Sequence, residues 1–174
     1  MARHVEPIRV GCTGWAIPAT SGAAFPQIGS HLERYARRFG AVEISSSFHR
    51  HHLPRIYARW AATAPVDFRF AVKLPRAVTH AARLGPAGLP GLDRFPAEAG
   101  HPGERLGPLL VQLPPGLASD AARATAFFAA LAARTAAAIA CEPRHPSWFT
   151  GATPRTATPR PPIPRTARPC AAAS

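Results

Sequence analysis

The segment Phe68–Pro75 is the third of five apolar runs that the sequence pattern predicts as β-strands. Its apolar and polar side chains alternate, so one face of the strand would be apolar and the other would carry Arg69 and Lys73. A strand held between two helix layers is apolar on both faces, whereas a barrel strand can turn polar side chains inward at its C-terminal end. The alternation in this middle strand therefore favours a barrel of parallel strands.

Segments with helical periodicity separate the predicted strands. The strands are expected near residues 8–14, 42–48, 68–74, 108–113 and 137–142. Ser30 and Glu33 form a capping-box pattern before a helix that should end at Gly40. Pro54 should begin a second helix, and Ser119 is expected to cap the helix after the fourth strand. Because strand and helix alternate steadily, we predict an α/β fold with right-handed crossovers and a parallel sheet in the order 1-2-3-4-5.

The stretch between Pro75 and Gly107 gives the weakest pattern. A short helix is expected around Val78–Leu84, followed by a Gly- and Pro-rich loop. Loops of this length in compact domains are often functional. The patterns GxGxxG after the first strand and GxxxxGK[ST] are absent from the sequence, so neither a dinucleotide site nor a P-loop is predicted.

Chain length and charge limit what such a fold can be. The sequence has 174 residues, and a complete eight-unit barrel typically needs about 250, so we expect an incomplete TIM-like (β/α) barrel. A formal net charge of +12 is the electrostatic signature of a protein that binds nucleic acid or phosphate. The same excess of arginine arises from a GC-rich coding sequence without selection for binding, and both interpretations stay open.

The cysteines and the hydropathy indicate the compartment. Cys12, Cys141 and Cys170 are widely spaced and form no CxxC pair, so neither a disulfide framework nor a zinc site is predicted. The sequence contains no apolar leader and no run of about 18 apolar residues. It therefore predicts a soluble, cytoplasmic protein that makes no membrane contact.

Polar residues stand at the ends of the predicted strands, and in a barrel these ends meet at one mouth. That mouth would gather Glu43, Lys73, Gln112, Glu142 and Arg144, with His80 and His145 from the loops. Two carboxylates that flank a lysine can hold one carboxyl group protonated, so Glu43, Lys73 and Glu142 are the candidate catalytic residues. A buried ion-pair network without catalysis would explain the same residues.

Two further clusters follow the second strand. His49, His51 and His52 lie close enough in sequence to suggest a metal site, but no ligand pattern such as HExxH accompanies them, and no metal or other cofactor is predicted. The serines at 45–47 lack the GxSxG pattern of a hydrolase nucleophile. We expect these serines to line the mouth as hydrogen-bonding residues.

Five motifs occur in a specific order along the chain. They are GCTGW from Gly11, VEISSSFH from Val42, FRFAVKLPRAVTH from Phe68, LGPLLVQLPP from Leu106 and EPRHPSWF from Glu142. Together they resemble the YecE-like family (domain of unknown function 72) over roughly residues 8–149. The resemblance implies a TIM-like barrel and no settled activity. It also implies a mouth lined by Thr13, Trp15, Glu43, Ser47, Lys73, His80, Gln112, Glu142, Arg144 and Trp148.

The sequence departs from the family pattern at two places. Ser45 stands where the family usually has Asn, which shortens one polar side chain at the mouth. After Phe149 the chain continues with a Pro- and Arg-rich segment that has no acidic residue and no periodicity. We expect a domain over residues 1–150 and a disordered tail over 151–174, as in a truncated or frameshifted member of the family.

The predicted function is binding or processing of a phosphorylated ligand, with nucleic acid as the first choice. Phosphate contacts would come from Arg50, Lys73, Arg76 and Arg144, and Trp15, Phe48 and Trp148 could stack on bases. One alternative is a small-molecule enzyme in which Glu43 and Glu142 transfer protons and Lys73 tunes them. The other alternative is a non-catalytic interaction module. The oligomeric state stays open.

Overall fold

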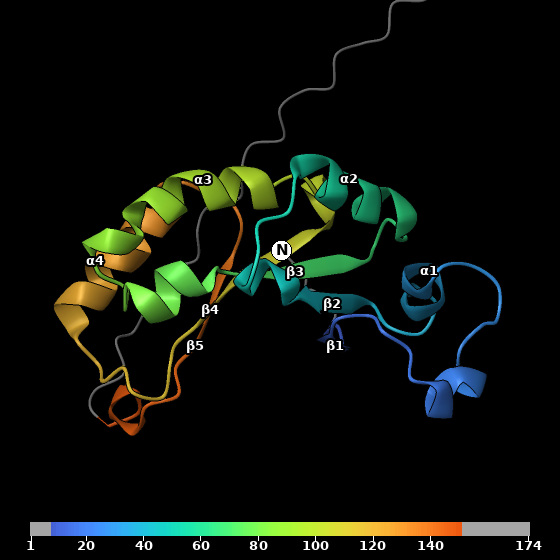
Figure 1. Cartoon of the computed structure of the whole chain (residues 1–174), viewed down its shortest axis with the longest axis horizontal. Helices are drawn as coiled ribbons and strands as arrows, with labels where there is room; N and C mark the ends of the chain where they lie inside the picture. The colour runs from blue at the N-terminus through green and yellow to red at the C-terminus, as the bar shows by residue number, and fades with distance from the viewer. Residues whose placement is uncertain (1–7, 151–174) are drawn as a thin grey trace, which may run out of the picture.

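Five parallel strands form one sheet in the order β1-β2-β3-β4-β5 in the computed structural model, which describes residues 8–150 (Figure 1). The strands are β1 (Gly11–Thr13), β2 (Ala41–Ile44), β3 (Arg69–Lys73), β4 (Leu106–Gln112) and β5 (Ile139–Glu142). Every neighbouring pair is parallel. The predicted strand order and direction are therefore confirmed.

Four α-helices connect the strands and lie along one side of the sheet (Figure 1). They are α1 (His31–Ala36), α2 (Pro54–Thr63), α3 (Leu89–Ala99) and α4 (Ala121–Ala132). The predicted capping box begins α1, since the Ser30 hydroxyl accepts from the Glu33 N–H at 3.3 Å and the Glu33 carboxylate accepts from the Ser30 N–H at 2.6 Å. Pro54 occupies the first turn of α2, where its missing N–H has no cost.

The core lies between the sheet and these helices. Alternate strand residues are buried there, namely Val42, Ile44, Phe70, Val72, Leu109 and Val111. The intervening residues, including Glu43, Lys73, Gln112 and Glu142, are only half-buried on the opposite face. The apolar and polar faces predicted from the middle strand are therefore present on all three central strands.

Two predictions about the ends of elements were wrong. The second strand ends at Ile44, and Ser46–Phe48 form a 3₁₀-helix, so Ser45 and Ser47 do not alternate along a strand as expected. Asp120 rather than Ser119 caps α4, because the Asp120 carboxylate accepts from a first-turn backbone N–H at 3.0 Å.

The stretch that we expected to be a Gly- and Pro-rich loop contains helix α3, and the short helix expected over Val78–Leu84 is a five-residue π-helix, η3 (Ala77–Ala81). The apolar residues Leu92, Phe95 and Ala99 are buried at helical spacing, and this spacing was the overlooked signal. Burial of that apolar stripe outweighs the poor helix propensity of the glycine and prolines.

The sequence predicted five parallel strands of an incomplete barrel, and the observed sheet agrees with that prediction. Within residues 8–150 the sheet is open, with β1 and β5 as its edge strands. The predicted disordered tail, 151–174, lies outside the described residues. In the described range, no helix has the length and apolar character needed to cross a membrane.

Candidate functional site

The C-terminal ends of β4 and β5 place an amide opposite a carboxylate. Gln112 and Glu142 are register partners, and the Gln112 Nε2 donates to both Glu142 carboxylate oxygens at 3.0 Å. Arg144, two residues after Glu142, donates to Glu142 Oε1 from Nε at 3.1 Å and from Nη2 at 3.0 Å. The Glu142 carboxylate therefore holds the amide and the guanidinium in fixed positions at the end of the sheet.

These contacts fix the protonation state of Glu142. Partial burial raises the pKa of its carboxyl, but the hydrogen bonds from Gln112 and Arg144 and the charges of Arg144 and Lys73 lower it further, so the net shift is downward. Glu142 is therefore an anion at neutral pH. The protonated carboxyl that we expected for acid–base chemistry is not favoured at this residue.

Lys73, at the end of β3, lies beside an aromatic ring and a histidine. Its Nζ is 4.8 Å from the centre of the Phe48 ring, and the His80 ring packs edge-on against the same ring at 4.9 Å. The Thr79 hydroxyl lies 2.9 Å from His80 Nδ1. Phe48 thus contacts both the lysine and the histidine at the mouth of the sheet.

The pKa of His80 is lowered by its surroundings. Burial lowers the pKa of His80, and the positive charges of Arg76, Lys73 and Arg144 lower it further. The imidazole is therefore neutral at neutral pH, and the charges of three cations act on it. We call Lys73, Arg76, His80 and Arg144 the basic cluster.

A second predicted group lies at the ends of β1 and β2. Glu43 and Trp15 line a hollow of about 280 Å³ together with His31. Trp15 packs edge-on against Trp60 of α2, with ring centres 5.0 Å apart. Thr13 lines a neighbouring hollow of about 610 Å³. Within residues 8–150, the Glu43 carboxylate has no hydrogen-bond or ion-pair partner.

The two candidate catalytic carboxylates are far apart. Glu43 is on β2 and Glu142 is on β5, three strands away. At a strand spacing of about 4.8 Å, their backbones are separated by roughly 14 Å across the sheet. The charge that acts on Glu142 comes from Lys73 and Arg144, not from Glu43. The charge of Lys73 thus acts on Glu142, while Glu43 lines a separate hollow.

Three other predicted ligand-binding residues make contacts that hold the loops. Ser47 is buried, and its hydroxyl lies 2.8 Å from the Ile44 carbonyl and 2.7 Å from the Lys73 carbonyl. The Trp148 indole donates to the Leu117 carbonyl at 2.7 Å. His145 Nδ1 lies 2.8 Å from the hydroxyl of Ser147, two residues later. Each of these contacts is made within the chain and stabilises a loop.

The three histidines after β2 turn to different partners. His51 contacts Glu98 at 2.9 Å, and the buried His52 contacts the Ser46 hydroxyl at 2.8 Å. His49 packs edge-on against Phe48, with ring centres 4.9 Å apart. In the part of the chain that the structure describes, no group of three His, Cys, Asp or Glu residues is placed to hold a metal ion.

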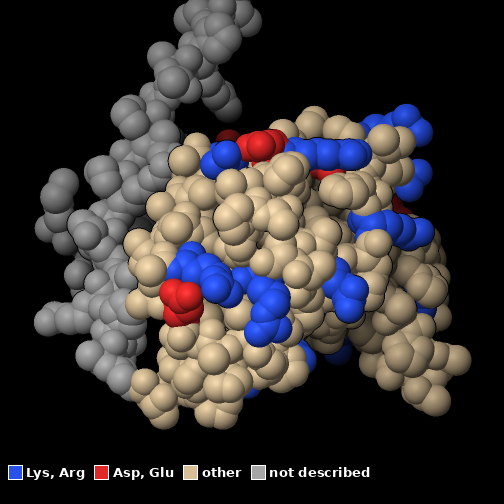
Figure 2. Space-filling view, turned by 60° about the vertical axis from the view of Figure 1, so that its left-hand side comes forward, with Lys and Arg blue, Asp and Glu red and all other residues tan. Residues whose placement is uncertain are grey.

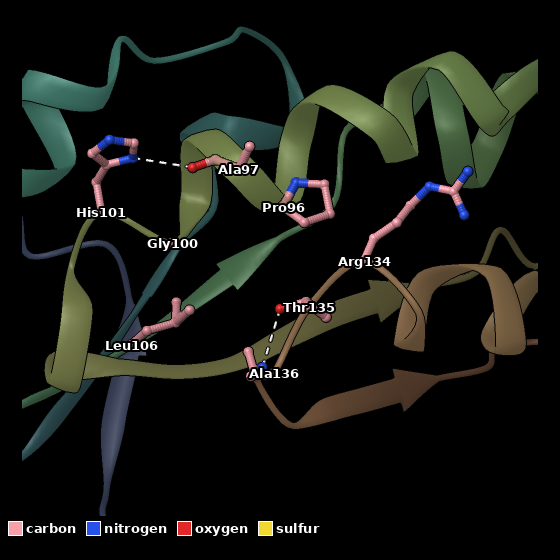
Figure 3. A pocket seen from close by; sticks show the side chains of 9 residues that line it. Pro96, Ala97, Gly100, His101, Leu106, Arg134, Thr135 and Ala136 are labelled. Atoms are coloured by element: carbon pink, nitrogen blue, oxygen red, sulfur yellow. Dashed lines mark hydrogen bonds between the residues drawn. The ribbon is translucent and has the colours of Figure 1, made fainter. Parts of the chain in front are cut away.

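A hollow that the sequence did not reveal lies at the opposite end of the sheet (Figure 3). It has a volume of about 460 Å³ and lies between the end of α3, the start of β4 and the segment that leads into β5. Leu106, Pro96 and several alanines line it, and His101 is bound through Nδ1 to the Ala97 carbonyl at 3.0 Å. The hollow went unpredicted because the stretch that holds its α3 residues was expected to be a loop.

Comparison with known proteins decides the family. The sequence matches the family described as "Protein of unknown function DUF72" over residues 9–158. The chain belongs to the DUF72 family. This DUF72 chain is 32% identical over 78 residues to the UPF0759 protein YecE of Escherichia coli strain K12, an alignment that covers 44% of this chain and 27% of YecE.

Two solved DUF72 structures share the fold. A DUF72 family protein from Thermotoga maritima MSB8 superposes with a TM-score of 0.64 at 24% identity, covering 83% of this chain and 58% of that protein. A DUF72 family protein from Enterococcus faecalis V583 superposes with a TM-score of 0.57 at 19% identity, covering 85% and 56%. This chain therefore spans little more than half the length of its solved relatives.

Proposed function

We propose that the basic cluster at the C-terminal end of the sheet binds a phosphorylated ligand, with nucleic acid as the first choice. One observation carries the proposal. Within residues 8–150, Lys73 and Arg76 form no ion pair with any carboxylate, although the charges of both act on His80. Arg144, the third cation of the cluster, is paired with Glu142. Cations without an ion-pair partner, such as Lys73 and Arg76, favour an anionic ligand, and Lys and Arg are the usual phosphate-binding residues.

The charge of the whole chain supports a polyanionic ligand. The sequence carries a formal net charge of +12, and Figure 2 shows basic side chains outnumbering acidic ones on one face of the molecule. A positive field of this kind raises the rate of association with nucleic acid. It gives no information about base sequence.

Phe48 is the aromatic residue best placed to contact a base. Its ring is half-buried and lies within the basic cluster, beside Lys73. The other two aromatic candidates lie elsewhere, since Trp15 packs on Trp60 of α2 and the Trp148 indole donates to the Leu117 carbonyl. Stacking of a base on an aromatic ring contributes about 1–3 kcal/mol and tolerates any base sequence.

A salt series with labelled oligonucleotides tests the proposal. The variant Arg76→Gln removes a charge from the basic cluster, and Arg55→Gln removes an exposed charge from α2 as a matched control. One lost phosphate contact should reduce the slope of log K against log salt by about 0.7–0.9. We expect this reduction for Arg76→Gln and not for Arg55→Gln. Absence of oligonucleotide binding by the wild-type chain at low salt, or equal effects of both variants, would refute the proposal.

A specific observation also favours a second function, that of a small-molecule enzyme. Glu43 has no partner within residues 8–150 and lines the hollow with Trp15 and His31, so its carboxylate is available as a proton acceptor. The test is to incubate the chain with cell extract and identify retained small molecules by mass spectrometry. A ligand retained by the wild-type chain and lost in Glu43→Gln would support this function over phosphate binding.

A further inference from the structure

We infer that the ligand is a single nucleic-acid strand whose backbone runs from the basic cluster into a second phosphate subsite beside Phe48. The inference rests on the proposed function and specifies its ligand. The second subsite is a hollow of about 340 Å³ between the segment that follows β2 and the segment that follows β3. His49, Arg50 and His51 line it from the first segment, and Arg76 lines it from the second.

The cations of this hollow are available to a ligand. Within residues 8–150, the guanidinium groups of Arg50 and Arg76 make no hydrogen bond and no ion pair. One carboxylate, Glu98, lies nearby, and it is already bound by His51 at 2.9 Å and by Arg94. The hollow therefore presents two unpaired arginines and no unpaired acid among the residues that line it.

The hollow and the basic cluster adjoin each other at Phe48 and Arg76. Phe48 lines the hollow and also contacts Lys73 and His80 of the cluster. Arg76 lines the hollow, and its charge acts on His80. A ligand with one phosphate in the hollow and the next at the cluster would pass beside Phe48.

This path selects a single strand. A hollow of about 340 Å³ between two loops has room for a phosphate and its sugar, whereas a double helix would have to remain outside it. A duplex is also stiff, with a persistence length of about 150 base pairs, and resists turning around one side chain. A single strand bends freely and can place an unpaired base on Phe48, as aromatic residues do in single-strand binding proteins.

The experiment measures binding of the full chain to fluorescent oligothymidylates of increasing length and to a duplex of the same length. The probe for a single subsite is thymidine 5′-monophosphate. We expect affinity to rise from the mononucleotide to the dinucleotide and to exceed that of the duplex. The variant Arg50→Gln should lower the salt slope for oligomers by about 0.7, whereas the control Arg55→Gln should leave that slope unchanged.

The outcomes separate this inference from the proposed function. If Arg76→Gln weakens oligonucleotide binding and Arg50→Gln does not, the basic cluster binds phosphate and the second subsite is refuted. Duplex binding as tight as single-strand binding would also overturn the inference while the proposed function stands. If no oligonucleotide binds at low salt, the proposed function itself fails and this inference fails with it.

Discussion

Replacing Ser47 with alanine should destabilise the folded chain. The Ser47 side chain is 1% exposed, and its hydroxyl lies within hydrogen-bond distance of the carbonyls of Ile44 and Lys73. These carbonyls stand at the ends of β2 and β3, so one hydroxyl joins the ends of two neighbouring strands. A hydroxyl has a single hydrogen, which the two carbonyls must share. Alanine removes that donor from a site that water does not reach.

The size of the effect follows from the burial. A hydrogen bond contributes about 0.5–1.5 kcal/mol net, and an acceptor left buried without a donor costs about 1–3 kcal/mol. We therefore expect Ser47→Ala to lower the free energy of unfolding by about 1–3 kcal/mol. For a chain of this length, each kcal/mol lowers Tm by about 2–4 °C.

Urea unfolding followed by circular dichroism measures the change, and Ser45→Ala is the matched control. The Ser45 side chain makes no hydrogen bond within residues 8–150, so its loss should change stability by less than about 0.5 kcal/mol. Ser47 was also predicted to contact ligand. If Ser47→Ala keeps wild-type stability and weakens oligonucleotide binding, the structural role argued here is refuted and the ligand role is supported.

Three further predictions concern a helix cap, a carboxylate and a glycine. Asp120→Ala should lower stability by about 0.5–2 kcal/mol through loss of the α4 cap, whereas Ser119→Ala should not, as urea unfolding of both will show. The folded-state pKa of Glu142 is lowered, so the stabilisation by its carboxylate is present above the unfolded pKa of about 4.3 and is lost as pH falls through the folded pKa. The difference in unfolding free energy between wild type and Glu142→Gln should therefore shrink on acidification from pH 7. A difference that grows on acidification would contradict the lowered pKa. Gly11→Ala would place a Cβ 2.0 Å from a carbonyl oxygen of β2 and should lower Tm, whereas Gly22→Ala, with open space around it, should not.

Sequence periodicity was sufficient where the structure depends on nearby residues. The alternation in Phe68–Pro75 gave the two faces of β3, and the Ser30 and Glu33 spacing gave the cap of α1. The order of strand and helix segments gave the parallel sheet, because right-handed crossovers leave few arrangements. The exact ends of the helices and strands were harder to predict from the sequence. Asp120 and Ser119 are both good capping residues, and boundaries read from sequence alone are uncertain by one or two residues.

The candidate site was also predicted from the sequence only in part. The sequence by itself determined which polar residues stand at strand ends, since side-chain alternation places Lys73, Gln112 and Glu142 on one face. Only the tertiary structure decided which of them meet. Register pairs Gln112 with Glu142, the strand order separates Glu43 from Glu142, and the early end of β2 turns Ser47 inward. These contacts join residues distant along the chain, and their geometry depends on how the helices pack on the sheet, which local periodicity does not encode.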